Sequence, residues 1–193
     1  KYRGCDFLFL ANIDPAVQLK VLESVKPKHS LCDTMNYWIG SRREELGEVF
    51  ESVDGIVIND SEARQFCGTS SLVKAGRQLT DLCGGKVIIK KGEHGALFFS
   101  GGDFFAVPGF PTADVVDPTG AGDSFAGGTL GHLAKHGLFT DEAVKKSIVC
   151  GSVVASYVVE GFGLDGLRGR GEGDIRQRYE LFRRFVAFDH GTV

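Results

Sequence analysis

The sequence predicts an α/β fold in which helices cover both faces of a mainly parallel sheet. Short runs rich in Val, Ile, Leu and Phe alternate along the chain with helical patterns of about 10–15 residues, the pattern of parallel strands joined by helical crossovers. With 193 residues, 42% of them hydrophobic and 24% charged, the chain is long enough to bury a core. No linker divides it, so residues 1–193 are interpreted as part of a single domain.

In the first half of the chain, three strands alternate with three helices. The strands are expected over residues 6–10, 30–34 and 54–59. The helices are expected over residues 16–25, after a turn at Pro15, then 42–53 and 61–68, where Gly68 ends the last one.

The second half begins with a helix predicted over residues 71–85, and the glycines at the end of this stretch are expected to end the helix. Strands are predicted over residues 86–92, 95–100 and 103–109, the last two as a hairpin, and a further strand ending at Val115 and Val116. Helices are then predicted from Asp123, over residues 140–159 and, after a glycine-rich loop, over residues 174–185.

Charge and composition argue against several kinds of partner. The net charge is −3 and no dense basic block is present, which argues against nucleic-acid binding. No apolar run approaches the roughly 20 residues that span a bilayer, so we expect no membrane interaction. The five cysteines form no C-x-x-C pair, and they fit a reducing, cytoplasmic location better than a disulfide framework.

The stretch "DPTGAGD", residues 117–123, combines a predicted turn with small residues and a helix start. Gly120, Ala121 and Gly122 leave backbone N–H groups uncovered, and such a nest before a helix dipole binds anions. Asp123 beside this nest could take the proton of an attacking hydroxyl group. The simpler interpretation is an N-capping aspartate with glycines that allow close packing.

Two other phosphate-binding motifs fit the sequence poorly. A dinucleotide fingerprint would need a third glycine where Phe125 stands, and it would follow the first strand. The lysine of "GGKV" at residues 84–87 lacks the glycine spacing and the Ser or Thr of a Walker loop.

The stretch "VVDPTGAGDSFAGG", residues 115–128, resembles the C-terminal signature of the ribokinase-like (pfkB) carbohydrate and nucleoside kinases. Residues 59–62, "NDSE", match the N-x-x-E element of that family, and residues 87–97 match its strand-turn-strand near the nucleotide. The resemblance covers essentially the whole chain and implies a three-layer αβα sandwich. It extends only to the later two-thirds of such kinases, because their first strands, Gly-Gly sugar-binding element and lid have no counterpart here.

The resemblance implies roles for several residues of the motif. Asp123 would be the general base and the backbone of Gly120, Ala121 and Gly122 the anion hole. Asn59 and Glu62 would order Mg²⁺ and its waters against the phosphates. Asp117 and Thr119 match positions that bind a monovalent cation, such as K⁺, in some relatives.

The resemblance also places the nucleotide. Gly92 and Gly95 match the turn near the phosphates, and Lys90 stands where the family usually has a threonine. Lys90 could contact phosphate as a point charge, or it could form a solvated pair with Lys91. The adenine would lie near Val149 and Ser152.

Asp33 and Asn36 lie in "CDTMNYW", at the end of a predicted strand, where relatives carry a D-x-N or D-x-x-N element. They are candidates for contact with the substrate, although Asp33 could equally be a turn residue. His132 and His136 are interpreted as surface or packing residues, because no third zinc ligand accompanies them.

These features predict an ATP-dependent kinase that phosphorylates a hydroxyl group of a sugar or nucleoside, a small-molecule substrate. A kinase of a vitamin-like alcohol and a catalytically incompetent nucleotide-binding fragment remain as alternatives, and an NAD-binding oxidoreductase ranks after both. Because the front of the resembling kinases has no counterpart, we expect an unpaired sheet edge, self-association into a homo-oligomer or aggregate, and no kinase activity from the 193 residues alone.

Overall fold

The computed structural model describes residues 2–187. In chain order, its elements are β1 (Phe7–Leu10), α1 (Pro15–Val25), β2 (His29–Cys32), α2 (Asn36–Ser41), α3 (Arg43–Ser52), β3 (Gly55–Asn59), α4 (Asp60–Cys67), α5 (Leu72–Cys83), β4 (Lys86–Lys90), the 3-10 turn η1 (Gly92–His94), β5 (Ala96–Ser100), β6 (Asp103–Val107), α6 (Ala121–His136), α7 (Asp141–Val158) and α8 (Glu172–Val186).

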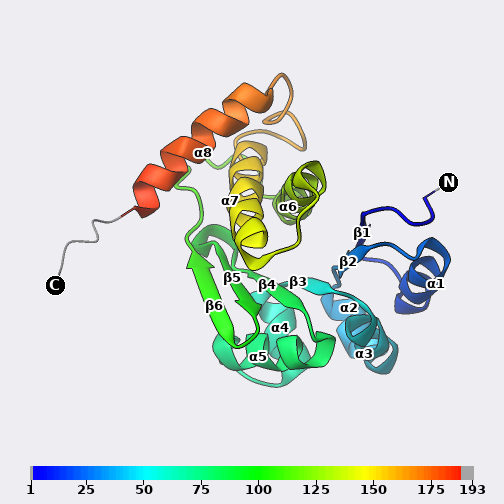
Figure 1. Ribbon diagram of the computed structural model, residues 1–193. Helices are drawn as coiled ribbons and strands as arrows, with labels where there is room; N and C mark the ends of the chain where they lie inside the picture. The colour runs from blue at the N-terminus through cyan, green and yellow to red at the C-terminus, as the bar shows by residue number, and fades with distance from the viewer. Residues whose placement is uncertain (1, 188–193) are drawn as a thin grey trace.

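One sheet of six strands runs through the middle of the molecule (Figure 1). Its strands lie in chain order, β1-β2-β3-β4-β5-β6. The first four are parallel, whereas β5 and β6 join antiparallel to the strands before them. The predicted α/β class, the mainly parallel sheet and the hairpin of β5 and β6 are therefore confirmed.

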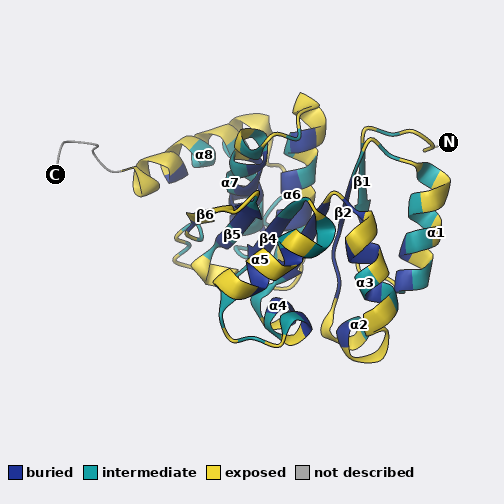
Figure 2. Ribbon diagram, turned by 60° about the horizontal axis from the view of Figure 1, so that its bottom comes forward, coloured by how far each residue is buried: buried dark blue, intermediate teal, exposed yellow. Residues whose placement is uncertain are grey.

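Side chains of alternate residues along β1 to β5 pack into two separate cores. In β4, Val87 and Ile89 belong to a core shared with α1 to α5, whereas Ile88 belongs to a core shared with α6, α7 and α8. Buried residues therefore line both faces of the central strands, while the outer faces of the helices are exposed (Figure 2). This arrangement is the expected three-layer sandwich.

Local signals define the helix ends. The Asp14 carboxylate accepts a hydrogen bond from Ala16 N at 2.9 Å, and Pro15 occupies the first position of α1. Gly68 and Gly84 end α4 and α5 in left-handed conformations, with φ of +63° and +62°. Both glycine stops were predicted.

The expected strand ending at Val115 and Val116 is wrong. No strand lies between β6 and α6 in the described residues, and Val115 and Val116 are 58% and 59% exposed. The amide of Val116 donates instead to Val159 O at 2.7 Å, past the end of α7. This segment thus pairs with a helix end rather than with a strand, although its β-branched residues favour extended structure.

Among residues 2–187, none of the helices combines the length and the apolar character that crossing a bilayer requires. All five cysteines are free thiols.

Candidate active site

The candidate site lies at the carboxyl edge of the parallel strands, where such sheets bind ligands. Asn59 and Lys90 end β3 and β4 and are paired in the strand register, and Asp33 follows the last residue of β2. Gln18 fixes the neighbouring loop: its buried Nε2 donates to Ala11 O at 2.9 Å and to Asp33 O at 3.1 Å. Gln18 was not among the residues predicted from the sequence, although a glutamine on the buried side of an amphipathic helix was an available signal.

Asp33 and Lys90 form a largely buried ion pair. Lys90 Nζ donates to Asp33 Oδ2 at 2.8 Å, and the two side chains are 16% and 8% exposed, respectively. The other carboxylate oxygen of Asp33 accepts from Thr34 N at 2.8 Å. The interpretation of Lys90 as a solvated lysine is therefore wrong, and Asp33 is more than a turn residue.

Glu62 lies beside this ion pair and is only 5% exposed. Its Oε2 accepts from Asn59 N at 2.9 Å, while Asn59 Oδ1 accepts from Glu62 N at 2.8 Å, so the two residues form a capping box at the start of α4. The pKa of the Glu62 carboxyl is raised, mainly because the group is buried, and the negative charge of Asp33 adds to this rise. The hydrogen bond from Asn59 N and the positive charge of Lys90 oppose it.

The start of α6 exposes backbone donors. Gly120 has φ of +80°, which favours glycine, and the helix begins at Ala121, two residues before the predicted start at Asp123. Ala121 N donates to Pro118 O and Ser124 N to Gly120 O, at 3.1 and 2.9 Å. The two amides between these donors, those of Gly122 and Asp123, have no acceptor in the part of the chain that the structure describes. The side chain of Asp123 is exposed.

Lys90 connects the strand edge to this helix start. A Cβ built on Gly122 would lie 3.8 Å from Lys90 Nζ, with no other atom within 4 Å. The ammonium group therefore lies close to Gly122 in the first turn of α6. The combination of a helix N terminus and a lysine can hold a phosphate and can stabilise negative charge that develops during its transfer.

Gly92 and Gly95 shape the turn after β4. Both have positive φ, +57° and +84°, and a Cβ on Gly95 would lie 2.0 Å from Val107 O. Gly95 is therefore required for close packing of the hairpin, whereas Gly92 faces open space.

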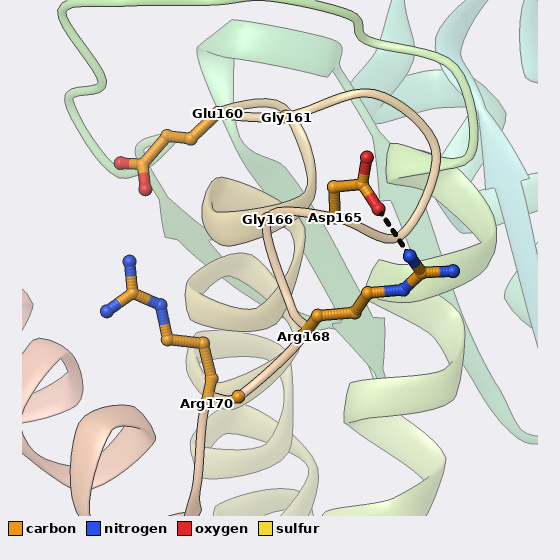
Figure 3. A pocket seen from close by; sticks show the side chains of 7 residues that line it. Glu160, Gly161, Asp165, Gly166, Arg168 and Arg170 are labelled. Carbon is orange, nitrogen blue, oxygen red and sulfur yellow. Dashed lines mark ion pairs between the residues drawn. The ribbon is translucent and has the colours of Figure 1, made fainter.

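Asp117 and Thr119 lie in the turn before the helix. Asp117 Oδ1 accepts from Thr119 N at 3.0 Å, and this hydrogen bond lowers the pKa of Asp117. Beside this turn, the loop after α7 forms an open hollow of about 400 Å³. In Figure 3, Arg168 pairs with Asp165 on one side of the hollow, and the side chains of Glu160 and Arg170 lie on the other.

The remaining predicted residues lie apart from these contacts. Asn36 donates to Gln65 Oε1 at 2.7 Å on an exposed part of α4. On α7, Val149 packs against the core and Ser152 is 7% exposed. His132 contacts Ser147 Oγ through Nδ1 at 2.9 Å, in agreement with a packing role.

The polar side chains at this edge suit Mg²⁺ better than a metal ion whose ligands all come from the protein. The described residues contain no group of three or more His, Cys, Asp and Glu side chains that could hold a metal ion. Glu62 nevertheless offers a carboxylate at this edge of the sheet, held by its hydrogen bonds with Asn59. Mg²⁺ is commonly bound through one or two carboxylates, several waters and the phosphates of a substrate, so the residues present fit it.

Comparison with known proteins identifies the family. The model of the "pfkB family carbohydrate kinase" matches residues 8–166, and the chain belongs to this family. It is 34% identical over 135 residues to the cytidine kinase of Thermococcus kodakarensis, covering 67% of this chain and 48% of that protein. It is 36% identical over 104 residues to the aminoimidazole riboside kinase of Salmonella typhimurium, covering 51% and 32%.

Solved structures show the same fold. The aminoimidazole riboside kinase of Salmonella enterica, complexed with aminoimidazole riboside and an ATP analog, matches with a TM-score of 0.72 at 21% identity, over 92% of this chain and 63% of that one. A fructokinase of Vibrio cholerae in a form with bound fructose, ADP and calcium ion matches with a TM-score of 0.74 at 16% identity, over 93% and 62%. The chain thus spans less than two-thirds of these relatives.

Proposed function

We propose that the protein transfers the γ-phosphoryl group of ATP to a hydroxyl group of a sugar or nucleoside. The proposal rests on one observation: the free amides of α6, the Lys90 ammonium group and the buried Glu62 carboxyl converge at the carboxyl edge of the sheet. Membership of the pfkB family and the names of the related cytidine and riboside kinases support the acceptor class.

Asp123 acts as the general base. Its exposed carboxylate stands in the first turn of α6, where a bound acceptor can reach it. It takes the hydroxyl proton as the hydroxyl oxygen attacks the γ-phosphorus and the bond from that phosphorus to ADP breaks. The anion hole predicted at Gly120, Ala121 and Gly122 acts through the free amides of Gly122 and Asp123, which stabilise the charge on the phosphoryl oxygens, whereas the amide of Ala121 already donates to Pro118 O. Lys90 adds a point charge on the strand side of this hole.

The other contacts complete the nucleotide site. Asn59 and Glu62 hold Mg²⁺ through its waters, and the metal neutralises phosphate charge when bound. The turn of Gly92 and Gly95 lies along the phosphates, and the base lies towards Val149 and Ser152 of α7. Asp117 and Thr119 hold a monovalent cation such as K⁺.

Two measurements on the full-length protein test this function. Titration with ATP and Mg²⁺ should show binding, and labelled γ-phosphate should pass to at least one member of a panel of ribose, fructose, ketodeoxygluconate, adenosine and cytidine. Binding without transfer to any hydroxyl compound would favour a catalytically incompetent nucleotide-binding protein. Absence of both would contradict the proposed function.

A further inference from the structure

Asp33 contacts Lys90, and this contact gives it a role different from that of a substrate ligand. One oxygen of Asp33 accepts from Lys90 Nζ and the other from Thr34 N, both at 2.8 Å. The side chain is 8% exposed. Both oxygens are thus already engaged, and little of the carboxylate surface is available to the hydroxyl groups of an acceptor.

Lys90 keeps free donors in the presence of Asp33. An ammonium group has three N–H donors, and within residues 2–187 Asp33 is its hydrogen-bond partner. The side chain is also long and flexible, so without a fixed partner the ammonium group would sample many positions. The contact with Asp33 keeps it against Gly122, at the start of α6.

The charges around Lys90 explain why Lys90 and Asp33 occur together at this edge of the sheet. Asp33 and Glu62 are both buried carboxyl groups close to Lys90. Lys90 offsets this negative charge next to a site that must accept an anionic phosphate. Removing such an ion pair from water costs free energy, and the pair often contributes little to the stability of the fold. Stability alone is therefore a poor explanation for the presence of Lys90 and Asp33 here.

Resting on the proposed kinase function, we propose that Asp33 is a positioning residue that holds Lys90 at the anion hole, where Lys90 donates to the transferred phosphoryl group. Asp33 then acts on the nucleotide only through Lys90. It does not select the acceptor.

A double-mutant cycle on the full-length protein tests the pair. Lys90→Met keeps the stem and removes the charge, and we expect kcat/KM for ATP to fall about 100-fold, as for loss of a donor to the transition state. Asp33→Asn should lower it about tenfold, with KM for the acceptor unchanged within about twofold. The double variant should resemble Lys90→Met alone, because Asp33 has no role once Lys90 is absent.

The matched control is the ion pair at the other end of β4, made by Lys86 and Asp141. Lys86→Met and Asp141→Asn should leave kcat/KM within about twofold, and thermal unfolding of every variant separates folding effects from function. Affinity for a non-hydrolysable ATP analogue gives the same cycle without turnover.

Losses from Asp33→Asn and Lys90→Met that multiply in the double variant would overturn the proposal. A rise in acceptor KM with ATP kinetics intact would overturn it as well and return Asp33 to the acceptor site. If the wild-type protein neither binds the analogue nor transfers phosphate, the proposed function itself fails.

Discussion

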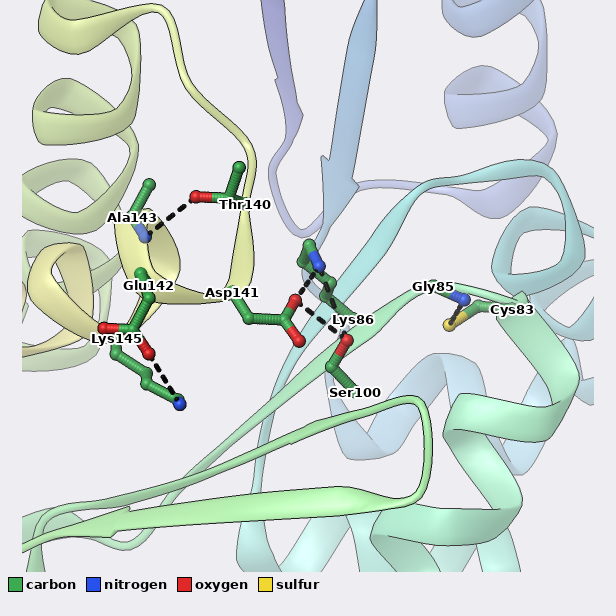
Figure 4. Close-up of polar contacts among 9 residues, drawn as sticks. All are labelled: Cys83, Gly85, Lys86, Ser100, Thr140, Asp141, Glu142, Ala143 and Lys145. Carbon is green, nitrogen blue, oxygen red and sulfur yellow. Dashed lines mark hydrogen bonds and ion pairs between the residues drawn. The ribbon is translucent and has the colours of Figure 1, made fainter.

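Strand β4 carries a lysine at each end, and the two lysines form ion pairs of different kinds. Lys86, at the start of the strand, contacts Asp141 of α7, whose side chain is 46% exposed. Ser100 Oγ also donates to Asp141, at 3.0 Å, and Figure 4 shows the three side chains meeting. Lys90, at the end of the strand, contacts Asp33, which is 8% exposed.

The difference shows what an ion pair does at each edge of a parallel sheet. At the amino edge, water, Ser100 and the N terminus of α7 can all solvate Asp141, so the pair joins β4 to α7 at little cost. At the carboxyl edge, the pair is buried beside Glu62 and the free amides of α6. An ammonium group placed there suits the anionic phosphate of the proposed function.

The largest expected effect on activity comes from replacing Asp123 in the first turn of α6, and Asp141 in the first turn of α7 serves as its comparison. Asp123→Asn should retain nucleotide binding and lower kcat by about 10²–10⁴-fold, because an amide cannot take the hydroxyl proton. Asp141→Asn should leave kcat within about twofold. Steady-state kinetics compare them, and turnover of Asp123→Asn within tenfold of wild type would exclude it as the base.

The next effect concerns magnesium. Glu62→Gln keeps the shape and an acceptor for Asn59 N, but it removes the charge, so the Mg²⁺ concentration for half-maximal rate should rise about 10- to 100-fold. The folded pKa of Glu62 is raised, so ionisation costs stability as pH rises from about 4.3 through the folded value. The Glu62→Gln variant should therefore not show this loss of stability when denaturant unfolding is measured over a series of pH values. An unchanged magnesium titration would refute the metal role.

A smaller effect is expected from a single methyl group at the anion hole. Gly122→Ala places a Cβ 3.8 Å from Lys90 Nζ and should lower kcat/KM for ATP about tenfold, or about 1.4 kcal/mol. Gly127→Ala, on an exposed part of the same helix with no atom within 4 Å, is the control and should stabilise by about 0.5–1 kcal/mol. Equal kinetics for the two variants would argue against phosphate binding at Gly122.

The smallest effect belongs to the amino edge. The hydrogen bond from Lys86 lowers the folded pKa of Asp141, so its stabilisation is present above the unfolded pKa of about 3.9 and is lost as pH falls through the folded value. Because Asp141 is partly exposed, we expect Asp141→Asn to cost less than about 1 kcal/mol at pH 7 and nothing at low pH. Urea unfolding at both pH values measures this, and an equal cost at both would contradict the pairing.

Sequence reasoning predicted most of the fold because its signals are local. Apolar runs, Pro15 and the stops at Gly68 and Gly84 identified strands and helix ends within a few residues. It was wrong about the strand at Val115 and Val116, since whether a β-branched segment forms a strand depends on an available pairing edge. Here the segment binds Val159 instead.

The candidate site was predictable only in part. The G-A-G-D turn and the N-x-x-E capping box are each contained within four residues, so the sequence reveals them. The contact between Asp33 and Lys90 joins residues 57 positions apart, one just after β2 and the other at the end of β4, and β3 lies between these two strands. Strand ends predict that both residues lie at one edge, but the pairing of the side chains depends on the packing around them.

The most direct measurement compares the two lysines of β4 in nucleotide binding. Isothermal titration of the full-length protein with a non-hydrolysable ATP analogue and Mg²⁺ should show affinity at least about tenfold weaker for Lys90→Met, because a charged contact to phosphate is lost. Lys86→Met should bind within about twofold of wild type. Equal affinities for the two variants, or a larger loss for Lys86→Met, would contradict a nucleotide site at the carboxyl edge.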